Sequence, residues 1–285
     1  MKLLQRKIDS ILKEWKKNEN RLPLIVKGAR QVGKTASILQ FAHSNYKNVV
    51  AINFVLQPKY KAIFEEGYEV DDIIRNLTLI DPSLKIEPTN TLIFFDEMQD
   101  CPACATSLKA FKIDGRYDVI CSGSLMGINY QEIESNSVGY KEDYTMHSMD
   151  FEEFLWAKGY DSSFINSLYD KMTTVTPLTR IEMDILEKIF REYMTIGGMP
   201  AVVNQFVSNK NFSGTLKMQQ QLLLDYEEDI TKYAHGLDKG RIKNVYDHIT
   251  VFLGQDNKKF QISKIARGAR NREYVGTIEW LRNAG

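Results

Sequence analysis

The chain has 285 residues, 43% of them hydrophobic and 26% charged, which is the composition of a globular protein with room for one large domain or two smaller ones. It carries 37 basic and 37 acidic residues, so no overall charge draws it to nucleic acid or to an anionic membrane. A charged start and the lack of an apolar run of about 18 residues argue against a signal peptide and a membrane span, so we expect a cytoplasmic protein without membrane contact.

The cysteines also favour a cytoplasmic protein. Cys101, Cys104 and Cys121 leave one thiol unpaired in any disulfide scheme, which fits a reducing compartment. Cys101 and Cys104 have the spacing of half a zinc site, but no second pair of this kind follows in the sequence. We therefore interpret all three as structural or incidental thiols.

The first half of the chain alternates short apolar runs with longer helical patterns. Residues 4–16 repeat apolar side chains at helical spacing and predict a helix within an N-terminal segment, residues 1–20. Further on, the expected strands are residues 24–26, 49–54, 91–95 and 119–121, and the expected helical stretches are residues 35–43 and 59–77, the latter broken at Gly67. This alternation predicts an α/β core, residues 21–148, with a parallel sheet sandwiched between helices.

The pattern changes after this core. Residues 151–159, 181–193 and 214–233 have helical spacing, and convincing strands no longer occur. The sequence Gly-Gly-Met-Pro at residues 197–200 predicts a turn. We expect a mainly helical lid or linker region over residues 149–255 and a separate element over residues 256–285.

A phosphate-binding loop is the strongest functional signal. Residues 28–35, GARQVGKT, fit the pattern GxxxxGK[ST] directly after an apolar strand and directly before a helix. Its glycines let the backbone approach a phosphate, Lys34 reaches the outer phosphates, and the Thr35 hydroxyl can hold Mg²⁺. The residues expected to bind ATP are Gly28, Ala29, Arg30, Gln31, Val32, Gly33, Lys34, Thr35 and Ala36. A plain glycine-rich turn is the alternative, and the lysine, the threonine and both flanks argue against it.

Two carboxylates end the apolar strand at residues 92–95. This strand is expected to lie beside the strand of the phosphate-binding loop, so Asp96 is suited to hold Mg²⁺ and Glu97 to polarise the water that attacks the terminal phosphate. A water-activating Glu97 favours hydrolysis over a small-molecule kinase. The structural alternative is an acidic strand end that only opens a loop. Ser122 and Ser124 follow the next strand, where a hydroxyl can sense the terminal phosphate or orient water, although serines at strand ends usually only form turns.

With these motifs in this order, the chain resembles a widespread prokaryotic group of AAA-type P-loop ATPases that carry a C-terminal domain of unknown function. The resemblance extends to MDFEEFL at residues 149–155 and to GGMP at residues 197–200, and so covers most of the chain. It implies an ATPase core with a helical lid, followed by a winged helix and a nuclease-like domain.

The last residues look like only part of that winged helix. A helix at residues 262–266, a turn near Gly268 and a second helix at residues 272–282 resemble its helix-turn-helix portion, and the chain ends where the wing would begin, so we expect a C-terminal truncation. Basic residues cluster at 258–272. Such an element contacts DNA phosphates or another protein, and both interpretations stay open.

One position departs from the pattern of the family. Where many relatives carry Gly-Arg before the FEEFL segment, this chain has Gly139 and Tyr140, so an arginine supplied there to a neighbouring subunit's ATP is not expected. Other candidates for such an arginine finger in a homo-oligomer are Arg116, Arg180, Arg191 and Arg241.

The sequence as a whole predicts an AAA-type ATPase that binds ATP with Mg²⁺ and hydrolyses it. Nucleotide state would be coupled to movement of the lid and the C-terminal part, on DNA if the basic cluster binds it. The alternative is an ATP-gated DNA-binding regulator with negligible hydrolysis.

Overall fold

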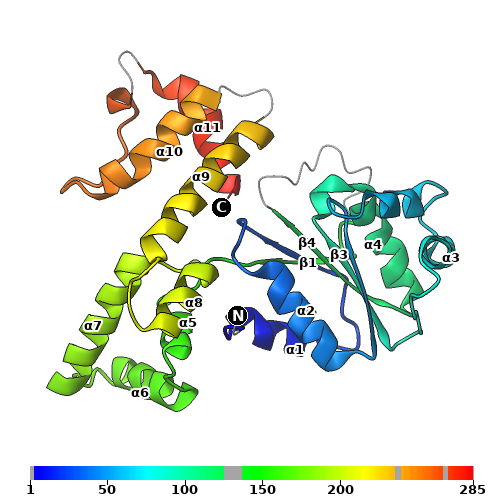
Figure 1. Cartoon of the computed structure of the whole chain (residues 1–285), viewed down its shortest axis with the longest axis horizontal. Helices are drawn as coiled ribbons and strands as arrows, with labels where there is room; N and C mark the ends of the chain where they lie inside the picture. Colours follow the sequence, from blue (N-terminus) through cyan, green and yellow to red (C-terminus); the bar gives the residue numbers. More distant parts are fainter. Residues whose placement is uncertain (1–2, 125–136, 235–238, 266–268, 285) are drawn as a thin grey trace. The chain divides into compact units, whose positions relative to one another are not determined.

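The structure is a computed structural model that describes residues 3–124, 137–234, 239–265 and 269–284 (Figure 1). It divides into two compact units, residues 1–216 and residues 217–285. This division falls near the start of one long helix, and the domain limits expected from the sequence stay predictions. In the described ranges, every helix is too short or too polar to cross a membrane.

A parallel sheet forms the centre of the first unit. Its strands, in the order β2-β3-β4-β1-β5, pair in parallel throughout. Their bounds are β1 (Leu24–Gly28), β2 (Asn48–Asn53), β3 (Thr91–Asp96), β4 (Asp118–Ser124) and β5 (Glu142–Thr145). The expected α/β class with a parallel sheet is therefore confirmed.

Helices cover both faces of this sheet, as the alternation of buried side chains requires. Leu92 and Phe94 pack towards α1 (Lys7–Lys17) and α2 (Lys34–Asn45). Ile93 and Phe95, on the opposite face, pack in a second cluster against the remaining helices of the core. These are the 3₁₀ helices η1 (Pro58–Phe64) and η2 (Met98–Asp100) with α3 (Val70–Ile80) and α4 (Ala103–Asp114), and Figure 1 shows α3 and α4 across the sheet from α1 and α2.

One expectation about the sheet was wrong, and one of its strands was not predicted. The strand that ends in Asp96 does not lie beside the phosphate-loop strand, because β4 is inserted between β3 and β1. Strand β5 was missed altogether. Its sequence, EDYT, is polar and mostly exposed, and what holds it is backbone pairing with β1 rather than an apolar pattern that a sequence can display.

Four helices follow β5 in the first unit, namely α5 (Phe151–Ala157), α6 (Ser162–Thr173), α7 (Arg180–Ile196) and α8 (Pro200–Asn209). Asp150 starts α5 with a capping box, in which its side chain accepts a hydrogen bond from the Glu153 N–H and the Glu153 side chain accepts one from the Asp150 N–H. Phe154 of α5 packs against Tyr193 of α7 and Phe206 of α8. The helical character expected after residue 149 is thus confirmed.

The second unit contains most of α9 (Thr215–Tyr233), then α10 (Lys239–Leu253), the 3₁₀ turn η3 (Ile262–Lys264) and α11 (Asn271–Ala284). Its buried side chains form two small clusters, one of them around Phe252 and Tyr274. The helix expected at residues 262–266 is present only as the short turn η3, whereas α11 matches the second expected helix. The turn expected near Gly268 lies outside the described residues.

Candidate nucleotide-binding site

The phosphate-loop sequence connects β1 to α2, as expected. β1 ends at Gly28, and α2 begins at Lys34 with Gly33 as its N-cap residue. Gly33 has φ +98°, a left-handed conformation that favours glycine. At Gly28 a side chain is excluded for a different reason, because a Cβ atom there would lie 2.2 Å from the carbonyl oxygen of Met146. The two glycines thus let the loop close tightly against the segment that follows β5.

Lys34 occupies the inside of this loop. Its ammonium group is buried and donates hydrogen bonds to the carbonyl oxygens of Gly28, at 3.0 Å, and Ala29, at 2.8 Å. Burial lowers the pKa of Lys34, while the nearby carboxylates of Glu97 and Asp96 act in the opposite direction. A cation held in this way at a helix N-terminus is a suitable partner for a phosphate group.

Asp96 is the hydrogen-bonding centre of the site. Its carboxylate accepts from the hydroxyl of Thr35 at 3.0 Å, from the side-chain amide of Asn53 at 3.1 Å, and from the hydroxyl of Ser122. Asn53 ends β2, Ser122 belongs to β4, and Thr35 stands in the first turn of α2. Because β3 lies between β2 and β4, its last residue receives side chains from both neighbouring strands.

The residues present fit a magnesium ion that enters with a nucleotide. Mg²⁺ prefers oxygen ligands, and sites of this kind combine one or two protein oxygens with phosphate oxygens and water. The Asp96 carboxylate and the Thr35 hydroxyl are such oxygens, 3.0 Å apart. Within the described ranges, no cluster of three or more His, Cys, Asp or Glu side chains that could hold a metal by itself occurs.

Glu97 follows directly and has an unusual backbone conformation. Its φ of +55° lies in the left-handed region, which costs a non-glycine residue about 1–2 kcal/mol. The side-chain amide of Gln99 donates to the Glu97 carboxylate, and the Gln99 oxygen accepts the N–H of Ser124 at 3.3 Å. Gln99 therefore fixes Glu97 relative to the end of β4.

The two serines have different surroundings. They lie within β4 rather than after it, and both are buried. Ser122 donates its hydroxyl to the Asp96 carboxylate, and a role of Ser122 in sensing the terminal phosphate stays a prediction. Ser124 pairs in register with Gly28, and its buried hydroxyl has no hydrogen-bond partner among the described residues.

Several candidate residues of the sequence lie elsewhere or serve the loop itself. Val32 is buried against the core, and Ala36 lies in α2. Arg116 forms ion pairs with Asp71 and Asp114, and Arg191 forms one with Glu187. The partners of both arginines therefore belong to this chain. Of the other two candidate arginine fingers, Arg180 begins α7, and Arg241 lies over the Tyr274 ring.

Three residues near the site were missed by sequence reasoning, Arg6, Asn53 and Gln99. Asn53 carried a usable signal, because it ends an apolar strand just as Asp96 does. Gln99 is close enough to Glu97 in sequence to have been considered. Arg6 carried no signal, since it precedes the first helix, far from the loop in sequence, and reaches it only through the tertiary fold.

Comparison with known families decides the class of the core. Residues 20–155 match a family model described as an AAA domain. The core is an AAA domain. Residues 187–285 match the model of a domain of unknown function, DUF8612. An AAA-type core followed by a C-terminal domain of unknown function is the organisation that the sequence predicted.

Individual relatives are distant. An uncharacterized protein of Haemophilus influenzae is 21% identical over 179 residues, which are 63% of this chain and only 40% of that protein. DnaA of Aquifex aeolicus, solved with bound AMPPCP, covers 96% of this chain and 85% of its own, with 12% identity and a TM-score of 0.41. The match to Drosophila ORC bound to DNA covers 95% of this chain and 84% of the ORC chain, with 12% identity and a TM-score of 0.39.

Proposed function

We propose that this AAA protein binds ATP together with Mg²⁺ at residues 28–36 and hydrolyses the terminal phosphate. The observation that carries the proposal is the contact between Asp96 and Thr35, 3.0 Å apart, at the start of the helix that follows the phosphate loop. It joins the two oxygen groups that the chemistry needs beside a buried, positively charged Lys34.

Each side chain has a distinct part in this proposal. Lys34 and the N–H groups of the loop bind the outer phosphates, and Thr35 and Asp96 hold the metal. When bound, Mg²⁺ supplies positive charge that offsets the negative charge of the phosphate oxygens. Asn53 and Ser122 keep the Asp96 carboxylate in place.

Water activation is assigned to the end of β3 and its neighbours. Glu97 accepts a proton from the attacking water, and the Gln99 amide holds the Glu97 carboxylate in position by donating a hydrogen bond to it. The Ser124 hydroxyl, buried without a partner among the described residues, can donate to the terminal phosphate or to that water.

The test is phosphate release by wild type, Lys34→Ala and Glu97→Gln, with nucleotide binding measured in parallel. We expect Lys34→Ala to lose binding, and Glu97→Gln to bind ATP while turnover falls by about 100-fold or more. Matched controls are Lys47→Ala and Glu87→Gln, because these two residues form an exposed ion pair away from the loop. A wild type that binds ATP but releases no phosphate, with or without DNA, would contradict hydrolysis and favour the ATP-gated regulator.

The basic cluster of the second unit supports DNA as a partner. Lys258, Lys259, Lys264, Arg270 and Arg272 are exposed, whereas Arg267 lies outside the described residues. Their charge would act on DNA phosphates, and such binding weakens steeply with salt. A gel shift of duplex DNA at several salt concentrations, with and without ATP, tests this. Binding that does not depend on salt would contradict it.

A further inference from the structure

A buried arginine joins the phosphate loop to two other parts of the first unit. Arg6 is 5% exposed, and its guanidinium group donates three hydrogen bonds to three separate segments. The acceptors are the carbonyl oxygen of Val32 in the phosphate loop at 2.6 Å, the carbonyl oxygen of His147 after β5 at 2.7 Å, and the carboxylate of Glu153 in α5 at 3.0 Å. No other part of the proposed mechanism uses this residue.

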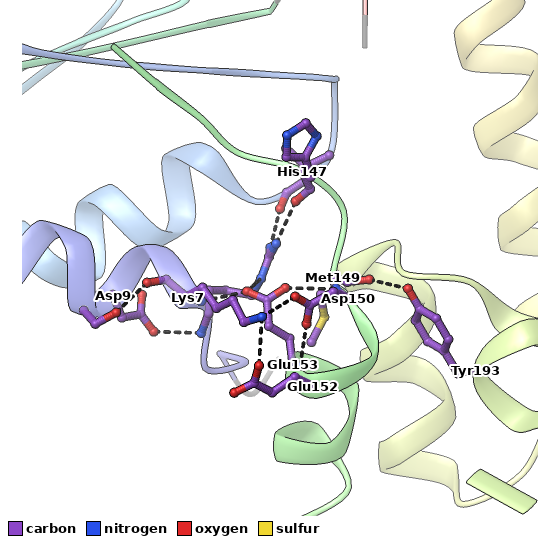
Figure 2. Close-up of polar contacts among 11 residues, drawn as sticks. Lys7, Asp9, His147, Met149, Asp150, Glu152, Glu153 and Tyr193 are labelled. Carbon is purple, nitrogen blue, oxygen red and sulfur yellow. Dashed lines mark hydrogen bonds and ion pairs between the residues drawn. The ribbon is translucent and has the colours of Figure 1, made fainter. Parts of the chain in front are cut away.

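The carboxylate of Glu153 completes the arrangement (Figure 2). Besides Arg6, it accepts the backbone N–H of Lys7 at 2.7 Å and that of Asp150 at 3.1 Å. These N–H groups stand at the N-termini of α1 and α5, where a negative charge is stabilised by the helix dipoles. The ion pair of Arg6 and Glu153 is therefore buried but well satisfied, which fixes the guanidinium group in one position.

The contact with Val32 determines how the end of the loop is oriented. In a trans peptide the C=O and the N–H point in opposite directions. Arg6 holds the carbonyl of Val32, so it also sets the direction of the Gly33 N–H, which belongs to the amide groups of the loop. Gly33 has left-handed φ and no side chain of its own to fix this peptide.

We propose that Arg6 is a positioning residue for phosphate binding: by holding the Val32 carbonyl it turns the Gly33 N–H towards the phosphate, and through Glu153 it ties the loop to α5. This inference rests on the proposed binding of nucleotide at the loop. Under this proposal, the segment that precedes the AAA domain contributes to the affinity of the loop for phosphate. A purely structural anchor for α1 is the competing explanation.

Two substitutions in the full chain separate these explanations. Arg6→Met and Glu153→Gln both abolish the ion pair. The glutamine oxygen can still accept the hydrogen bond from Arg6 Nε and hold the guanidinium group in place, so only Arg6→Met removes the contact with Val32. We expect the Kd for ADP to rise roughly tenfold to hundredfold in Arg6→Met, the effect of one charge-assisted hydrogen bond, and to stay within about threefold of wild type in Glu153→Gln. Lys7→Met is the matched control, because the Lys7 ammonium group pairs with Asp150 and Glu152 rather than with the phosphate loop.

Thermal unfolding without nucleotide is measured for each variant, since both substitutions will lower stability. If Arg6→Met does not fold, Arg6→Lys replaces it, because lysine keeps a positive charge opposite Glu153 but has one nitrogen instead of three; we then expect a rise in Kd of about fivefold or more. Equal affinity losses in the Arg6 and Glu153 variants, or a normal Kd in the Arg6 variant, would overturn the positioning role.

Lys34→Ala distinguishes failure of this inference from failure of the proposed function. If wild type binds ADP, Lys34→Ala does not, and the Arg6 variant binds as wild type, the loop is a nucleotide site and Arg6 only anchors α1. If wild type itself binds neither ADP nor ATP, both proposals are wrong.

Discussion

Replacing Asp96 by asparagine removes a charge from the site while keeping the shape of the side chain. An asparagine oxygen placed towards Asn53 and Thr35 preserves their two hydrogen bonds, which now measure 3.1 and 3.0 Å. The new NH₂ group then faces Ser122, whose hydroxyl can turn from donor to acceptor. All three contacts therefore survive in Asp96→Asn, and none survives in Asp96→Ala.

The magnitudes follow from this difference. A hydrogen bond to a charged acceptor contributes about 1.5–3 kcal/mol and one to a neutral acceptor about 0.5–1.5 kcal/mol, so three weakened bonds cost about 3–4.5 kcal/mol before any compensation. Relief from burying a charge offsets part of that cost. We expect the free energy of unfolding to fall by about 1–2 kcal/mol in Asp96→Asn and by about 3–4 kcal/mol in Asp96→Ala, where the donors of Asn53 and Ser122 lose their acceptor.

The assay combines urea unfolding, followed by circular dichroism without nucleotide, with phosphate release at several Mg²⁺ concentrations. Asp96→Asn should release phosphate at least about 100-fold more slowly than wild type, because an amide binds Mg²⁺ poorly. The variant protein should nevertheless remain folded. Asp118→Asn is a matched control, since Asp118 begins β4, at the other end of the strands, and pairs with Arg21 at 2.6 Å. Wild-type turnover in Asp96→Asn, or equal destabilisation by asparagine and alanine, would refute the reasoning.

Two further predictions concern the loop and the thiols. Gly28→Ala places a Cβ atom 2.2 Å from the Met146 carbonyl oxygen, so the backbone must shift; we expect loss of ATP binding by calorimetry, and unchanged affinity would contradict the close packing. Burial raises the pKa of Cys101 to about 11, so its stabilising effect is complete below the unfolded pKa of about 8.5 and is lost as pH rises towards 11. At pH 8 a thiol-specific disulfide reagent should therefore react at least about 100-fold faster after unfolding in urea; rapid reaction in the native state would contradict this.

The sequence by itself determined the parts of the site that are local. The phosphate loop from Gly28 to Thr35 is fixed by adjacent residues, because a strand, a glycine-bearing turn and a helix follow one another directly. Asp96 could be placed at a strand end for the same reason, since an apolar run that stops at a carboxylate is visible without a partner strand. The helical character after residue 149 was also visible in the sequence, because its apolar residues recur at helical spacing.

Only the tertiary structure decided which elements meet. Strand order depends on pairing between distant segments, so no local period showed that β4 separates β1 from β3. The same pairing brings Asn53 and Ser122 to the Asp96 carboxylate. Arg6 became part of the loop only when α1, the end of β5 and α5 had packed around it, because a buried guanidinium group is stable only where the fold supplies all of its acceptors.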